Sequence, residues 1–355
     1  MSLQEPGIIY KRIESTPVAC IRFNLKARPE IREAIQEIAC ALPQENVNGD
    51  PYCIMQYFSS YPEGFEVEVG FPVRNGFETK RIKSKTWPAL EVLSLIHQGS
   101  PEALSETRNE LVKFTRQKGL ISDEFTREVY LDWQDPQGAI EAQFVIHNWN
   151  ALLACNLERV LGKDKHKAIM DGAEEIGIET NLPERFTWVK GAIGRLNTSA
   201  NERQKYDIVS SCAHVFPLGQ LDKLKAVYDS THARNADPIQ SVDAVLAFMA
   251  SDPGWGEHGQ YRQDRIIYHT KNPADPHAFE LAKTPEEKRA AYCFCPIIRN
   301  NLGKGMSDTF CYCGSGWYRQ QWEEATGKPV IVEVIKSVIR GDDVCQFAVH
   351  LSDDL

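Results

Sequence analysis

The sequence lacks the features that would place this protein in a membrane or outside the cell. It contains no stretch of about 18 consecutive apolar residues, the length that a membrane-spanning helix needs. Its opening, MSLQEPGIIYKRIEST, lacks the basic-then-apolar pattern of a signal peptide. We therefore expect a cytoplasmic protein that has no membrane partner. We also expect its ten cysteines to be reduced rather than paired in disulfides.

Positive charge is also scarce. The formal net charge is −9, and lysine and arginine form no dense run. Binding to nucleic acid depends largely on neutralising phosphates with basic side chains. We therefore expect no direct nucleic-acid binding, and this charge suits a neutral or cationic ligand better.

The 355 residues are enough for two ordinary domains, each with its own core. The patterns predict an α+β protein with one domain over residues 1–150 and a second over residues 151–355. Two segments of the first domain show the same strand–helix–strand–strand pattern. Residues 8–25 are expected to be a strand pair. Duplicated units of this kind usually pack about a pseudo-two-fold axis and leave a groove between their sheets.

The two closing hairpins have the same length. Tyr57 to Glu68 and Tyr130 to Glu141 have equal spacing, which places Glu68 opposite Glu141 and Phe71 opposite Phe144 in the repeat. Before the second hairpin, Ser100 is expected to cap a helix that ends at Gly119.

The motifs FEVEVGFPV (residues 65–73), TREVYLDW (126–133) and AIEAQFVI (139–146) resemble the GyrI-like, or effector-binding, domain. The resemblance implies that Glu68 meets a lipophilic cation in an aromatic-lined cleft. Some members hydrolyse strained-ring compounds, and this chain matches their motif at Arg127, Glu128 and Tyr130. By the same resemblance, Glu68 and Glu141 are the candidate catalytic residues. The candidate ligand-binding residues are Tyr57, Glu68, Phe71, Glu128, Tyr130, Trp133 and Glu141.

The chemistry of a buried carboxylate agrees with this interpretation. Desolvation is costly for the charge, so the group keeps a cationic partner or takes up a proton. The alternative is that Glu66, Glu68 and Glu141 lie on solvated strand faces, because FEVEV alternates as a half-exposed strand does.

The second half begins with helical patterns and ends with a helix and a strand pair. Residues 316–328 predict a helix with Trp317 and Trp322 near one face and Gly327 as its cap. The strands and RGDD turn that follow resemble the close of 4-vinyl reductase and L-2-amino-thiazoline-4-carboxylate hydrolase-like domains. That resemblance implies small-molecule binding.

Four cysteines form two Cys-x-Cys pairs in this half, and they are candidate ligands of a zinc ion: Cys293, Cys295, Cys311 and Cys313. Two other interpretations stay open, a reactive thiolate activated by His214 beside Cys212, and plain packing. Cys345 is expected to pack.

The sequence therefore predicts a binder of a lipophilic, cationic or neutral small molecule. The alternatives are a hydrolase that opens a strained or heterocyclic ring, and a gyrase-modulator-like interaction module.

Overall fold

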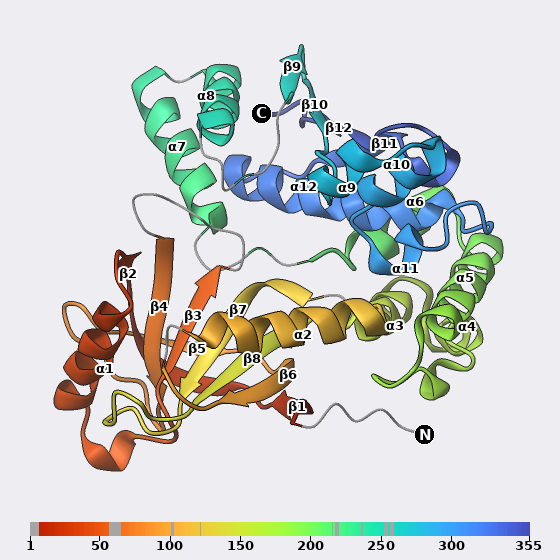
Figure 1. The fold of residues 1–355 in the computed structure, drawn as a ribbon. Helices are drawn as coiled ribbons and strands as arrows, with labels where there is room; N and C mark the ends of the chain where they lie inside the picture. The colour runs from red at the N-terminus through yellow and green to blue at the C-terminus, as the bar shows by residue number, and fades with distance from the viewer. Residues whose placement is uncertain are drawn as a thin grey trace. The chain divides into compact units, whose positions relative to one another are not determined.

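The computed structural model describes residues 7–56, 65–100, 103–120, 122–214, 216, 220–235, 237–251, 255 and 259–355. The chain divides into two compact units, Met1–His147 and Asn148–Leu355. Each unit combines helices with an antiparallel sheet, which confirms the α+β class (Figure 1). Within the described ranges, no helix has the length and apolar character needed to cross a membrane.

Unit 1 is built on one eight-stranded sheet with the strand order β1-β6-β8-β7-β3-β4-β2-β5. Its elements in chain order are β1 (Ile9–Ile13), β2 (Thr16–Leu25), α1 (Pro29–Ala41), β3 (Tyr52–Gln56), β4 (Phe65–Pro72), β5 (Lys83–Trp87), β6 (Leu90–His97), α2 (Leu104–Lys118), β7 (Ser122–Tyr130) and β8 (Ile140–Ile146). The two repeats therefore merge through β3 and β7 into a continuous sheet. The expectation that the two repeats form separate sheets was therefore wrong.

A pseudo-two-fold axis passes through the centre of this sheet. Ile54 of β3 lies opposite Arg127 of β7. Their numbers differ by 73, the same difference that relates Glu68 to Glu141. The sequence repeat and the strand register thus describe one symmetry.

The first strand of each repeat belongs to the other half of the sheet. Strand β1 pairs with β6 and β5 pairs with β2, so residues 8–25 do not form the expected strand pair. Two-residue hairpins favour turns with positive φ, which Gly, Asn and Asp supply. The links here are Glu14–Ser15 and Pro88–Ala89, which contain none of these residues, and no residue in either has a positive φ.

Both helices of unit 1 lie on one face of the sheet. Helix α1 packs against β2 and β4, and α2 packs against β6 and β8. The central strands β3 and β7 therefore lie between the two helices. Helix α2 begins at Leu104 with Ala103 as its N-cap, so the prediction of Ser100 as the cap was wrong, whereas Gly119 ends the helix with φ 63° as predicted.

Unit 2 begins with a run of helices, then forms a small sheet. Its helices are α3 (Trp149–Leu161), α4 (Lys163–Ile169), α5 (Leu182–Ser199), α6 (Glu202–Ser210), α7 (Gln220–Asn235), α8 (Pro238–Ser251), α9 (Pro276–Leu281), α10 (Pro285–Tyr292), α11 (Pro296–Arg299) and α12 (Tyr312–Thr326). The sheet has the order β11-β12-β10-β9, with β9 (Tyr261–Gln263), β10 (Ile266–Thr270), β11 (Ile331–Lys336) and β12 (Gln346–His350).

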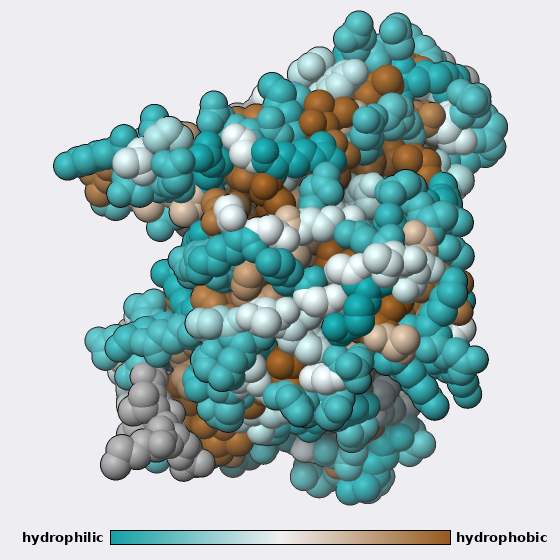
Figure 2. All heavy atoms as spheres, turned by 90° about the vertical axis from the view of Figure 1, so that its right-hand side faces the viewer, coloured by the Kyte–Doolittle hydropathy of each residue, from teal (hydrophilic) through white to brown (hydrophobic). Residues whose placement is uncertain are grey.

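The end of unit 2 follows the sequence pattern closely. Helix α12 ends at Gly327, which has φ 67°, and β11 and β12 are antiparallel neighbours. Trp322 on this helix is fully buried and donates its indole N–H to His269 Nε2 at 2.9 Å. On the face of the molecule shown in Figure 2, hydrophilic side chains predominate and hydrophobic ones appear as separate patches among them.

Candidate functional site

The sheet of unit 1 separates the predicted site residues into two groups. Side chains alternate along a strand, and directly paired residues of neighbouring strands point to the same face. Glu68 is paired with Ile54, and Ile54 with Arg127, so Glu68 lies on the helix-free face, where Glu141 also lies. The helix side carries Phe71, Glu128 and Tyr130. Tyr57 lies outside the described residues.

Glu68 is buried and fully engaged within the chain. Its side chain is 1% exposed. One carboxylate oxygen accepts from Tyr52 Oη at 3.0 Å and Trp87 Nε1 at 3.2 Å. The other accepts from Arg22 Nε at 2.9 Å and Lys85 Nζ at 2.5 Å. The cationic partner that a buried carboxylate requires is thus already supplied by the protein.

Lys85 also occupies the position that a ligand cation would take. Its ammonium lies 4.3 Å from the centroid of the Trp87 ring while it pairs with Glu68. A carboxylate beside an aromatic face is the usual recognition arrangement for an organic cation. A cationic ligand here would have to displace Lys85.

Glu141 repeats this arrangement in simpler form. Lys11 Nζ lies 2.5 Å from its carboxylate. Burial raises the pKa of Glu141, but hydrogen bonds from Lys11, Ser94 and Gln143 outweigh that effect and lower the pKa below its usual value.

The two lysines are themselves related by the repeat. Register places Lys11 of β1 opposite Val92 and Lys85 of β5 opposite Val18. Each lysine therefore joins an exchanged edge strand to a buried glutamate of the sheet. Because this lysine–glutamate ion pair occurs in both halves of the sheet, it is best explained as a structural feature of the repeat. The segments YKRI and SKTW place Lys11 and Lys85 at equivalent positions. The sequence therefore contained a signal for these two lysines, which were not predicted as partners of the glutamates.

The helix side carries a cluster around Glu128, a residue with no acidic counterpart in the first repeat. Glu128 is fully buried on β7. Its carboxylate accepts from Arg28 Nη2 at 2.7 Å and Tyr130 Oη at 2.7 Å, and it is also paired with Arg108. The residue related to Glu128 by the repeat is Met55, whose sulfur lies 3.4 Å from Arg108 Nη2.

Aromatic side chains extend this cluster. Phe71 and Trp133 make an edge-to-face contact with ring centroids 6.0 Å apart. The Arg32 guanidinium lies 5.5 Å from the centroid of the Tyr130 ring and donates to the Trp133 carbonyl at 2.5 Å. Four of the predicted binding residues therefore meet around three arginines that were not predicted.

The chemistry of the cluster is that of hydrogen-bond donors. Desolvation, and then the charge of Glu128, raise the pKa of Tyr130 well above its usual value, so the phenol stays protonated at neutral pH. The Arg108 Nε is buried and has no hydrogen-bond partner in the described part of the chain. The cluster therefore contains one carboxylate, that of Glu128, and three guanidinium groups, those of Arg28, Arg32 and Arg108.

The paired cysteines lie at the ends of helices in unit 2. Cys293 ends α10, Cys295 precedes α11, and Cys311 and Cys313 lie at the start of α12. All four are free thiols, and desolvation raises the pKa of each, to about 12 for Cys295 and about 11 for Cys313. Across the described ranges, no three His, Cys, Asp or Glu side chains form a group that could hold a metal ion. The zinc hypothesis stays a prediction for elemental analysis.

The other candidates of unit 2 are placed in the core. Cys212 is fully buried, and desolvation raises its pKa far above the range of a reactive thiolate. Cys345 packs against both core clusters of the unit. Burial therefore disfavours a Cys212 thiolate at neutral pH, and the reactive-thiol hypothesis stays a prediction.

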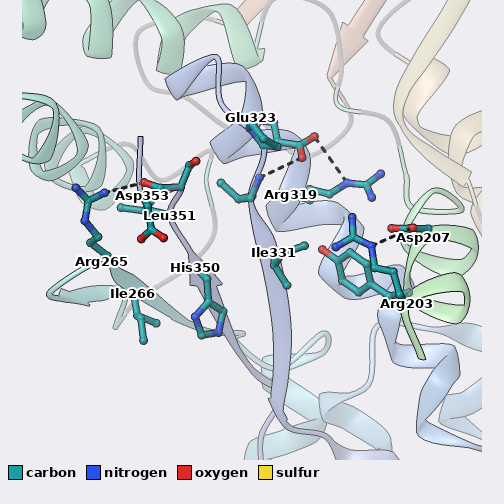
Figure 3. A pocket seen from close by; sticks show the side chains of 14 residues that line it. Arg203, Asp207, Arg265, Ile266, Arg319, Glu323, Ile331, His350, Leu351 and Asp353 are labelled. Atoms are coloured by element: carbon teal, nitrogen blue, oxygen red, sulfur yellow. Dashed lines mark hydrogen bonds and ion pairs between the residues drawn. The ribbon is translucent and has the colours of Figure 1, made fainter. Parts of the chain in front are cut away.

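Unit 2 also contains a hollow of about 590 Å³ beside β11 and α12 (Figure 3). Two of its three arginines have an acidic neighbour. Arg203 Nε is 3.1 Å from Asp207 Oδ2, and Arg319 Nε is 3.8 Å from Glu323 Oε2. The third, Arg265, donates to the Ser352 carbonyl oxygen at 2.7 Å.

Comparison with known proteins gives matches to parts of this chain. A model described as a family of unknown function (DUF6144) matches residues 287–355. No curated protein matches the chain significantly.

Similar solved structures include EcmrR in a complex with DNA, at 24% identity and a TM-score of 0.35, covering 39% of this chain and 56% of that one. This chain therefore spans little more than half of EcmrR. The EcmrR C-terminal domain matches at 25% identity and a TM-score of 0.33, with 39% of this chain and 96% of that one covered. SAV2435 bound to tetraphenylphosphonium matches at 13% identity and a TM-score of 0.30, with 41% of this chain and 96% of that one covered.

Proposed function

We propose that unit 1 binds a lipophilic small molecule on the helix side of its sheet, over β3 and β7 and between α1 and α2. The observation that carries this proposal is the cluster around Glu128. It lies beside the pseudo-two-fold axis, and the residue related to its central Glu128 in the first repeat is Met55. The GyrI-like motifs of the sequence support the same class of function.

The exposure of the charged groups favours a ligand with an electron-rich or anionic end. The Glu128 side chain is 0% exposed, whereas those of Arg28 and Arg108 are 28% and 24% exposed. A ligand arriving from solvent therefore meets guanidinium groups before it meets the carboxylate. Planar guanidinium groups bind carboxylates and similar acceptors strongly. The aromatic rings of Tyr130 and Trp133 would contact the apolar body.

Two probes of nearly the same shape and opposite charge test this preference. Tetraphenylborate and tetraphenylphosphonium are titrated calorimetrically into the full chain. We expect the borate anion to bind more tightly. Arg108→Met should weaken its binding about twofold to thirtyfold, since a contact between a guanidinium group and an aromatic ring face contributes about 0.5–2 kcal/mol.

Arg22→Met is the matched control, because it also removes one of two cations from a buried glutamate, but on the helix-free face. It should leave the affinity unchanged. If Arg22→Met weakens binding and Arg108→Met does not, the ligand binds at Glu68 instead. If neither probe binds, the proposal fails. Conversion of a strained-ring substrate would favour the hydrolase alternative, for which the Tyr130–Glu128 hydrogen bond supplies a positioned proton donor.

A further inference from the structure

Lys271 of unit 2 lies where the two Cys-x-Cys segments approach β10 and β12. Its backbone N–H donates to the Cys345 carbonyl at 3.0 Å, and its own carbonyl accepts from the Tyr292 hydroxyl. These two bonds fix the main chain directly after β10.

The Lys271 ammonium is surrounded by aromatic rings. Its Nζ lies 5.0 Å from the centroid of Phe294 and 5.7 Å from the centroids of both Tyr318 and Phe347. Tyr318 and Phe347 are buried, whereas Phe294 is 54% exposed. Gly314 permits this packing, because a Cβ at that position would lie 2.8 Å from Phe347 Cζ.

No carboxylate of the described residues forms an ion pair with this ammonium, and no described acceptor forms a hydrogen bond with it. Ring faces attract a cation but leave its N–H donors largely unsatisfied. Cys313 and Cys345 lie within range of the lysine charge, and both are thiols rather than acids. The half-buried ammonium thus has aromatic neighbours and no anionic partner among the described residues.

We propose that Lys271 is the anion-binding residue of a second ligand site, which takes a small aromatic carboxylate. The carboxylate of the ligand pairs with the ammonium, and its planar body stacks on the exposed Phe294 ring. Phe294 is the central residue of the first Cys-x-Cys pair. This assignment gives that motif a role in forming the aromatic wall, independent of any metal.

Benzoate is the probe, with benzyl alcohol as its uncharged counterpart. The full chain is labelled briefly with acetic anhydride with and without benzoate, and acetylation at each lysine is measured by peptide mass spectrometry. We expect benzoate, and not benzyl alcohol, to protect Lys271. The exposed Lys336 at the end of β11 should be acetylated equally in both samples.

Calorimetric titration of variants supplies the second readout. Lys271→Met keeps an apolar chain among the rings and should weaken benzoate binding at least tenfold, or about 1.4 kcal/mol. Phe294→Ala should also weaken it, and Lys336→Met should leave it unchanged. Unchanged affinity in Lys271→Met, or no saturable benzoate binding to the wild-type chain, would overturn the proposal and leave Lys271 as a packing residue. Benzoate also suits the guanidinium groups of unit 1, so the Lys271→Met comparison is repeated in an Arg108→Met background, where the same loss of affinity should be found.

Discussion

Replacement of Glu68 by glutamine tests whether its ion pairs stabilise the sheet of unit 1. Glutamine keeps the shape but removes the charge that two cations and two neutral donors share. Loss of one partner of a buried ion pair costs about 3–5 kcal/mol. Arg22 and Lys85 are 35% and 27% exposed and regain hydration, so the lower end of about 3 kcal/mol applies. For a unit of this size, that loss lowers Tm by roughly 6–12 °C.

The pseudo-symmetric Glu141→Gln variant is the control. Glu141 has a single cation, Lys11, which is 40% exposed, so the loss is at most about 1 kcal/mol. Scanning calorimetry of both variants measures the two shifts, after the transition of unit 1 has been assigned. Equal shifts in the two variants, or no shift for Glu68→Gln, would refute the reasoning that the four donors of Glu68 are structural.

The stabilisation by Glu141 should depend on pH. Because the pKa of Glu141 is lowered in the folded state, this stabilisation is present above the usual pKa of 4.5 and is lost as the pH falls through the folded value. The difference in Tm between the wild type and Glu141→Gln should therefore shrink in acid, and a constant difference would argue against the ion pair. Gly316→Ala places a Cβ 1.8 Å from the Ser210 carbonyl oxygen and should destabilise unit 2 by more than about 3 kcal/mol in urea titrations. Gly194→Ala, with no atom within 4 Å of the new Cβ, should instead stabilise it by up to about 1 kcal/mol. Similar effects of both variants would contradict the packing of α6 against α12. The four-thiol zinc hypothesis predicts stoichiometric zinc in the purified chain that is lost in Cys293→Ser and Cys311→Ser, and metal-free protein would reject it.

Local patterns predicted the individual elements well. Gly119 and Gly327 end their helices as predicted. These features depend on a few neighbouring residues, so they can be recognised without tertiary contacts. The repeat was also visible, because both halves keep the same spacing.

Local sequence patterns could not predict which strands pair or on which face of the sheet each side chain lies. The pairing of β1 with β6 joins segments about 80 residues apart, and no local pattern specifies it. The division of Glu68 and Glu128 between opposite faces depends on register across β3 and β7. Arg28 and Arg108 come from different helices, so only the fold brings them together at Glu128.

The position of the ligand relative to the sheet tests the central claim most directly. The chain has five methionines, and Met55 lies on the helix side beside Arg108. In a sample labelled with ¹³C at the methionine methyl groups, tetraphenylborate should shift the Met55 resonance and give nuclear Overhauser effects to it, with Met170, Met249 and Met306 of unit 2 unchanged. Saturable binding that leaves the Met55 resonance unmoved would contradict the account.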